Sequence, residues 1–333
     1  MDPLLILSLL MSFLLTLFFT PFWIRKGKQV GLIWEDMHKK HQTKRVTGSG
    51  GIGVFFGFVF GILVYIAIKT FYFKTTDNLI EIFAMLSAIS IIGFVGFIDD
   101  LLGWRKGGLS KRSRILLLIF AAIPLIVINA GESSMMGLEF GVFYPLIIIP
   151  LGIVGASATF NFLAGYNGLE SSQGILILAA LALVAYATGY GWLSLVALCM
   201  VAALLAFYIF NKTPAKVFPG DILTYPVGAL IAIIAILGNM EKIAIFFFIP
   251  YIIETVLKVR GRLKKESFAK VNLDRSLEMP YSKIYGLEHL AIRLLKGGKT
   301  NSKAHEKEVV YLLNIFQIII IILGLIIFKI PIF

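Results

Sequence analysis

The residues with the clearest chemical potential are three aspartates and two amides that adjoin long apolar runs. The stretch "GFIDD" places Asp99 and Asp100 near the end of one run, and "FPGD" places Asp221 at the start of another. Asn161 and Asn167 belong to "NFLAGYNGLE", which closes a third run. Carboxylate and amide oxygens, without a set of Cys or closely spaced His ligands, favour a hard cation such as Mg²⁺ or Mn²⁺. These residue types therefore predict a divalent-metal site.

Each motif also has a plain structural explanation. Asn and Gly are common turn residues, and Asp221 could serve only as a helix N-cap. The aspartate pair is harder to explain, because two carboxylates near a helix C-terminus oppose the helix dipole unless a positive partner offsets them. Five basic side chains follow that pair and would suit a diphosphate: Arg105, Lys106, Lys111, Arg112 and Arg114. The pattern favours metal-assisted chemistry on a phosphorylated substrate.

The composition is that of a polytopic membrane protein. Of the 333 residues, 58% are hydrophobic and only 15% are charged, and the mean hydropathy is +0.89. A membrane-spanning helix needs about 20 mostly apolar residues. We therefore predict an all-α fold in which residues 1–333 form a single transmembrane catalytic domain. The ten predicted spans are 3–24, 49–68, 79–98, 115–130, 143–162, 173–189, 191–210, 222–238, 243–258 and 309–330.

The basic residues predict the orientation of these spans. If ten helices cross the membrane, 27 of the 31 Lys and Arg residues fall in loops on one side, 13 of them within residues 258–308. Basic loops remain cytoplasmic, so both termini are expected on the outer side. All the candidate site residues fall on the cytoplasmic side. The net charge of +12 thus follows from topology, and nucleic acid is not an expected partner.

A membrane transporter is the alternative from another functional class. Transporters place polar groups near the middle of the membrane at broken helices, often within an inverted repeat. Here the polar candidates gather on one side, and the apolar runs carry almost no charge. The sequence therefore favours an enzyme that works at the membrane surface.

Four segments together resemble a known family. "GFIDDLLGWR", "NFLAGYNGLE", "VFPGD" and "LEMPYSKIYG" occur in the order typical of the polyprenyl-phosphate N-acetylhexosamine-1-phosphate transferases. The chain is most similar to the branch that uses UDP-GlcNAc and dolichyl phosphate to start N-glycan lipid precursors. Gln173 completes an N-x-LAG-x-NGLE-x-x-Q pattern of that branch. The resemblance extends from about residue 31 to residue 290.

The resemblance implies a reaction. The phosphate of a dolichyl or other polyprenyl lipid would attack the β-phosphorus of UDP-GlcNAc, giving lipid-diphosphate-GlcNAc and UMP. This would be the first step of lipid-linked oligosaccharide assembly for protein N-glycosylation. The enzyme would lie in a prokaryotic plasma membrane or an endoplasmic-reticulum membrane, with its catalytic face cytoplasmic. Use of a different UDP-N-acetylhexosamine for a cell-envelope polymer is the alternative, and a homodimer is compatible with the sequence.

The resemblance also implies residue roles. Asn161 and Asp221 resemble the ligands of a Mg²⁺ ion, for which Mn²⁺ could substitute. The uridine would be bound by Met37, Gly165, Asn167 and Phe218, with Asn167 reading the edge of the base. Catalysis is expected to involve Asp99 and Asp100, with either Lys111 or Arg114 on the diphosphate, and direct attack is preferred to a covalent aspartyl intermediate. Further contacts to the diphosphate or sugar are expected from Asp36, Arg260 and Arg262, and the basic loop 258–308 would contribute to the substrate site or contact anionic lipids.

Overall fold

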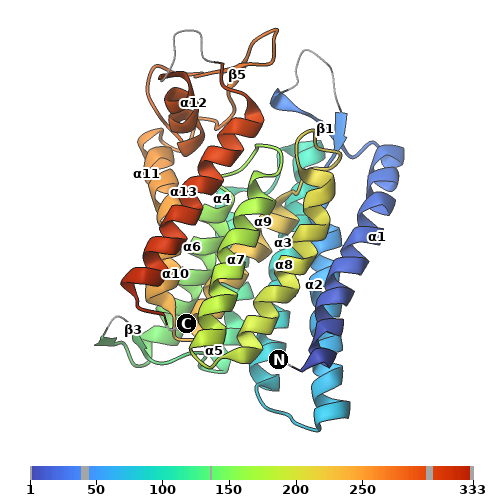
Figure 1. Ribbon diagram of the computed structural model, residues 1–333, viewed down its shortest axis with the longest axis vertical. Helices are drawn as coiled ribbons and strands as arrows, with labels where there is room; N and C mark the ends of the chain where they lie inside the picture. Colours follow the sequence, from blue (N-terminus) through green and yellow to red (C-terminus); the bar gives the residue numbers. More distant parts are fainter. Residues whose placement is uncertain (1, 39–44, 136, 298–302, 331–333) are drawn as a thin grey trace.

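Six apolar runs form long helices in the computed structural model, which describes residues 2–38, 45–135, 137–297 and 303–330 (Figure 1). They are α1 (Ile6–Val30), α2 (Gly51–Ala67), α3 (Leu79–Lys106), α7 (Leu169–Ala187), α8 (Gly191–Asn211) and α13 (Glu306–Ile327). A short 3₁₀ turn, η1 (Pro3–Leu5), precedes α1, and a π-helical turn, η3 (Ile68–Phe73), lengthens α2. Each of these six is long and apolar enough to cross a membrane. The structure confirms an all-α membrane protein.

Proline accompanies a break in two of the other predicted spans and lies in the first turn of a third. The span predicted at 115–130 is divided into α4 (Lys111–Ala121) and α5 (Ile123–Val127). The one at 143–162 starts with a π-helical turn, η4 (Tyr144–Ile148), before α6 (Ile149–Phe160), and the one at 243–258 is divided into α10 (Glu241–Phe247) and α11 (Ile249–Arg260). Proline lies in the first turn of α5, η4, α6 and α11, because it lacks an N–H and clashes with a preceding helical turn. The count of ten spans stays a prediction.

Three short antiparallel hairpins accompany the helices. They are β1 (Ile33–Glu35) with β2 (Arg45–Thr47), β3 (Ser134–Met135) with β4 (Leu138–Glu139), and β5 (Lys270–Val271) with β6 (Leu277–Glu278). The first hairpin is joined to the segment before α9 (Asp221–Leu237), since the Phe218 N–H donates to the Thr47 carbonyl oxygen at 2.8 Å. The predicted basic loop 258–308 contains β5, β6 and the helix α12 (Leu287–Gly297).

Small side chains let the helices that carry the motifs pack closely. Gly96 of α3 lies against the first residue of α9: a Cβ at this position would sit 2.5 Å from the Asp221 carbonyl oxygen. Small residues commonly allow such close approach between membrane helices. The contact sets Asp99 and Asp100, about one turn further along α3, beside the start of α9.

The candidate site residues gather at one end of the bundle. This end carries β1, β5, α12, the end of α3 and the start of α9, whereas the start of α1 and the end of α13 lie at the opposite end (Figure 1). The predicted basic loops therefore share an end, and the two terminal helices begin and finish at the other. Which end faces the cytoplasm stays a prediction.

Candidate functional site

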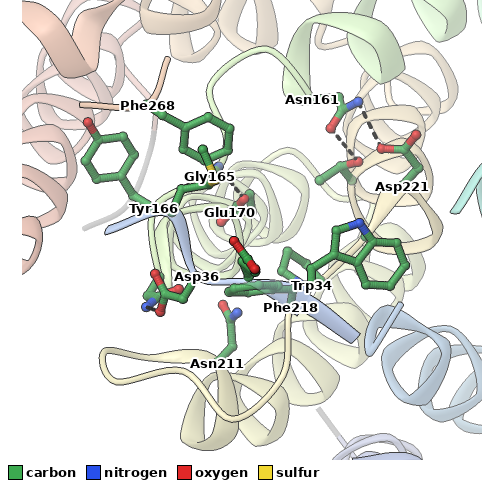
Figure 2. A pocket seen from close by; sticks show the side chains of 16 residues that line it. Trp34, Asp36, Asn161, Gly165, Tyr166, Glu170, Asn211, Phe218, Asp221 and Phe268 are labelled. Carbon is green, nitrogen blue, oxygen red and sulfur yellow. Dashed lines mark hydrogen bonds between the residues drawn. The ribbon is translucent and has the colours of Figure 1, made fainter. Parts of the chain in front are cut away.

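Asn161 and Asp221 lie in direct contact although 60 residues separate them in sequence. Asn161 follows the last residue of α6, and Asp221 is the first residue of α9. The Asn161 Nδ2 donates to Asp221 Oδ1 at 3.0 Å, and Thr224 Oγ1 donates to Asn161 Oδ1 at 3.1 Å (Figure 2). The two residues predicted as metal ligands are thus brought together, and Thr224 joins them.

Asp100 caps the start of α9 from the neighbouring helix. Its Oδ1 accepts the Asp221 N–H at 2.8 Å, and its Oδ2 accepts the Ile222 N–H at 3.4 Å. The free N–H groups at a helix start favour a carboxylate there. Gly220 has φ +75° and leaves no room for a Cβ beside this carboxylate. The aspartate pair does not end α3, as the sequence suggested, because the helix continues to Lys106.

Asp99 is held by a different set of donors. Arg114 of α4 contacts both of its oxygens, with Nε 2.5 Å from Oδ2 and Nη2 3.1 Å from Oδ1. The Leu109 N–H donates to Oδ1 at 2.7 Å, and the Tyr225 hydroxyl donates to Oδ2 at 3.3 Å. Arg114 therefore supplies the positive partner that the sequence required for one member of the pair. Nothing in the local sequence marked Tyr225.

A cavity of about 470 Å³ joins the predicted metal ligands to the predicted uridine residues. Its wall includes Asn161 and Asp221 (Figure 2). It also includes all four residues expected to bind uridine: Met37, Gly165, Asn167 and Phe218. Trp34, Tyr166 and Phe268 add aromatic surface to it.

Gly165 depends on a buried acid for its position. It has φ +99°, which favours glycine, and its N–H donates to Glu170 Oε1 at 2.7 Å (Figure 2). Glu170 is the second residue of α7 and is 4% exposed. A Cβ on Gly165 would lie 2.9 Å from the ring of Phe268. Glu170 thereby positions the glycine loop, a role that sequence reasoning had not assigned.

A second cavity, of about 490 Å³, continues from the first and is basic. The two share Asn161, Gly165 and Phe268, and the second is also lined by Lys111, Arg114, Lys258 and Lys265. Lys258 is 8% exposed and contacts Glu254 and Ser267. The sequence indicated Lys111 and Arg114, but it gave no signal that separated Lys258 from the other basic residues nearby.

Arg260 and Arg262 lie elsewhere. Both are exposed, and neither is among the described residues that line these two cavities. The Arg260 guanidinium lies 6.0 Å from the centre of the Tyr285 ring. Their contact with a diphosphate or sugar stays a prediction.

The aspartates share a third, smaller cavity of about 300 Å³. Asp99, Asp100 and Arg114 line it, and Asp221 lines both this cavity and the 470 Å³ cavity. Three carboxylates and the Asn161 amide thus lie around adjoining spaces at one end of the bundle. An oxygen donor set of this kind suits Mg²⁺ better than a thiophilic metal.

Sequence comparisons relate the chain to known proteins. Residues 82–239 match the sequence model of glycosyl transferase family 4. A protein of Saccharolobus solfataricus, provisionally named a UDP-N-acetylglucosamine–dolichyl-phosphate N-acetylglucosaminephosphotransferase, is 36% identical over 87% of this chain and 88% of its own length. A Sulfolobus acidocaldarius protein with the same provisional name is 34% identical over the same shares of the two chains.

A related enzyme with a different substrate also matches. The phospho-N-acetylmuramoyl-pentapeptide-transferase of Halalkalibacterium halodurans is 31% identical over 77% of this chain and 82% of its own length. The matches cover the segments that carry the aspartates, the glycine loop and the metal-ligand candidates. The chain belongs to glycosyl transferase family 4, the family of polyprenyl-phosphate N-acetylhexosamine-1-phosphate transferases that its four motifs resemble.

Proposed function

We propose that this protein transfers N-acetylglucosamine 1-phosphate from UDP-GlcNAc to dolichyl phosphate or a similar polyprenyl phosphate. The products are lipid-diphosphate-GlcNAc and UMP. The observation that carries the proposal is the shared cavity, in which Asn161 and Asp221 lie with the residues expected to bind uridine. The provisional names of the two archaeal relatives support the same donor and acceptor.

The donor set fits a resident Mg²⁺ ion. Asp221 and Asn161 would hold it, and Asp100 lies within hydrogen-bonding distance of the Asp221 backbone. When bound, a divalent cation neutralises charge on a diphosphate and stabilises the leaving phosphate. A Mn²⁺ ion would suit the same oxygens.

The chain's own residues support a direct displacement. An oxygen of the lipid phosphate attacks the β-phosphorus, the bond from that phosphorus to the bridging oxygen breaks, and UMP leaves with the electron pair. Asp99 is paired with Arg114, and Asp100 is bound to two backbone N–H groups, so both carboxylates are engaged as positioned charges. Lys111, Arg114 and Lys258 face the basic cavity, where phosphate oxygens would find cationic donors.

The basic segment 258–308 takes part in this arrangement. Residues 263–268, which follow α11, contribute Leu263, Lys265, Glu266, Ser267 and Phe268 to the basic cavity. With the predicted orientation, this end of the bundle faces the cytoplasm, where UDP-sugars are available. The whole chain would then act as one transmembrane catalytic domain, in a prokaryotic plasma membrane or an endoplasmic-reticulum membrane.

A different UDP-N-acetylhexosamine is the second candidate, because the pentapeptide transferase of Halalkalibacterium halodurans also matches. The test is to incubate purified protein with Mg²⁺, dolichyl phosphate and a panel of UDP-sugars and to measure UMP release. UDP-GlcNAc should give the fastest release, and Asp221→Ala and Asn161→Ala should abolish it while the protein remains folded. Release from a UDP-muramoyl-pentapeptide alone would overturn the assignment of GlcNAc.

A further inference from the structure

Asn167 lies at a junction of three segments that are distant in the sequence. Its Nδ2 donates to Asp36 Oδ2 at 3.0 Å and to Glu306 Oε2 at 3.4 Å. Its backbone N–H donates to Glu306 Oε1 at 2.9 Å, across 139 residues. His38 completes the group, with Nδ1 3.4 Å from Glu306 Oε1. All four residues are buried, and Asp36 and Glu306 bring their acidic groups from the first hairpin region and from the start of α13.

The chemistry of this junction determines how the amide must point. An ionised carboxylate only accepts hydrogen bonds, so the NH₂ group of Asn167 has to face Asp36 and Glu306. The opposite rotation would place the amide oxygen against two carboxylates and leave its NH₂ group without them. The side-chain oxygen, Oδ1, is therefore the group that Asn167 can offer to the cavity it lines.

A second contact keeps Glu306 in place. Two turns further along α13, Asn314 Oδ1 accepts from Ser172 Oγ at 3.1 Å and from Gln173 Nε2 at 3.0 Å. Ser172 and Gln173 belong to α7, which begins directly after the Asn167 loop. Helix α13 thus contacts both the loop and the helix that follows it, and Gln173 makes one of these contacts.

The same group has the geometry of a metal cluster, because ligand atoms of Asp36, His38 and Glu306 lie within 4.8 Å of one another. Every carboxylate oxygen of the two acids already accepts a hydrogen bond, Asp36 Oδ1 from the His38 N–H and the other three from Asn167, so a cation would have to displace a donor at each of them. Those contacts favour an anchoring role for the two acids.

We propose that Glu306 and Asp36 are positioning residues that fix the Asn167 amide with its oxygen toward the nucleobase, so that the site selects uracil over cytosine. Uracil presents an N3–H donor to such an oxygen, whereas cytosine presents a lone pair at N3. A site built to accept a hydrogen bond rejects a ligand that lacks the donor. The inference rests on the proposed use of a UDP-sugar and adds the origin of its base specificity.

The test measures UMP and CMP binding to the purified full-length protein by titration calorimetry. Glu306→Gln and Asp36→Asn each replace a carboxylate by an amide that can donate, which allows Asn167 to rotate. We expect each variant to weaken UMP binding by about tenfold, with CMP binding changed less than about twofold, so the UMP-to-CMP preference narrows. With UDP-GlcNAc, KM should rise in Glu306→Gln while kcat stays within about twofold of the wild type, since Glu306 contacts the Asn167 amide and is not among the described residues that line the two cavities.

Glu308→Gln is the matched control. Glu308 lies in the same first turn of α13, is exposed and accepts the His305 N–H at 2.8 Å, so this change removes the same charge without touching Asn167. Its UMP-to-CMP ratio should equal that of the wild type. An unchanged ratio in folded Glu306→Gln and Asp36→Asn, or a wild type without preference for UMP, would overturn the inference.

Failure of the proposed function would look different, because the wild type would then neither bind UMP nor release it from a UDP-sugar. Thermal unfolding of each variant shows whether it is folded. If Glu306→Gln does not fold, Asp36→Asn decides the question by itself, since it leaves the hydrogen bonds between Glu306 and Asn167 available.

Discussion

Replacement of Asp100 separates its structural role from its catalytic one. Its carboxylate accepts two N–H groups at the start of α9 and lies beside Asp221. Asp100→Asn keeps an oxygen that can accept the Asp221 N–H, and Asn is about as good a helix cap as Asp. Asp100→Ala removes both bonds and should lower the free energy of unfolding by about 1 kcal/mol, the usual cost of a lost cap.

Activity should follow a different order. Both variants lose the carboxyl group next to Asp221, so both should lose at least about 100-fold in kcat, which is about 2.7 kcal/mol of transition-state stabilisation. The assay is UMP release from UDP-GlcNAc with Mg²⁺ and dolichyl phosphate, together with thermal unfolding of the same preparations. We expect Asp100→Asn to be as stable as the wild type, and we expect Asp100→Ala and Asp100→Asn to have equally low activity.

The control is Asp77→Asn, which removes an exposed aspartate in the turn before α3, at the opposite end of that helix. It should leave both activity and stability unchanged. If Asp100→Asn kept wild-type turnover, Asp100 would be a helix cap only, and the catalytic reading of the aspartate pair would be wrong.

Three further changes test other contacts. Arg114→Lys should lower kcat about tenfold, because Lys cannot contact both oxygens of Asp99; a steady-state rate equal to the wild type would contradict this. Gly165→Ala should raise KM for UDP-GlcNAc several-fold, because the residue has φ +99° and a Cβ would press on Phe268. An unchanged KM would argue against binding of the uracil ring at this loop. Burial, with the Lys258 ammonium nearby, lowers the pKa of His289 to about 4, so the unfolded chain binds a proton that the folded chain does not between pH 6.5 and about 4. Stability should therefore fall as the pH drops through this window, and the fall should be smaller in His289→Gln when unfolding temperatures are compared at pH 7.5 and 5.

The sequence predicted those parts of the fold that depend on local pattern. Long apolar runs gave α1, α2, α3, α7, α8 and α13, and loop charge placed the candidate residues at a common end. The breaks beside Pro124 and Pro250 do not follow from apolar composition, which continues across both prolines. Local composition does not show whether a proline bends a long helix or divides it, since neighbouring helices decide that.

Some residues of the candidate site could be predicted from the sequence, and others could not. Asn161, Asn167 and Asp221 stand within recognisable motifs, so their residue types and spacing were informative before their contacts were known. Glu306 lies in a sequence typical of a helix start, and only the three-dimensional structure places it beside Asn167. Lys258 is one of many basic residues in its segment, and only the structure places it at the basic cavity.

The two cavities also indicate where substrate specificity has to arise. The 470 Å³ cavity includes most of the motif residues, whereas the basic cavity beyond Asn161 receives Lys258 and Lys265 from the end of α11 and the segment after it, and Phe268 lines both. Under the proposed function, uridine diphosphate is common to the candidate donors, so residues that discriminate between sugars have to lie on the far side of the diphosphate. With the uridine in the 470 Å³ cavity, as proposed, the end of α11 and the residues that follow it would occupy that position, whereas the exposed Arg260 and Arg262 do not line the basic cavity. Exchange of residues 263–267, which contribute only to the basic cavity, with those of a relative should therefore change the preferred UDP-sugar, measured by UMP release, without changing the affinity for UMP. An exchange that altered UMP affinity alone would refute this division.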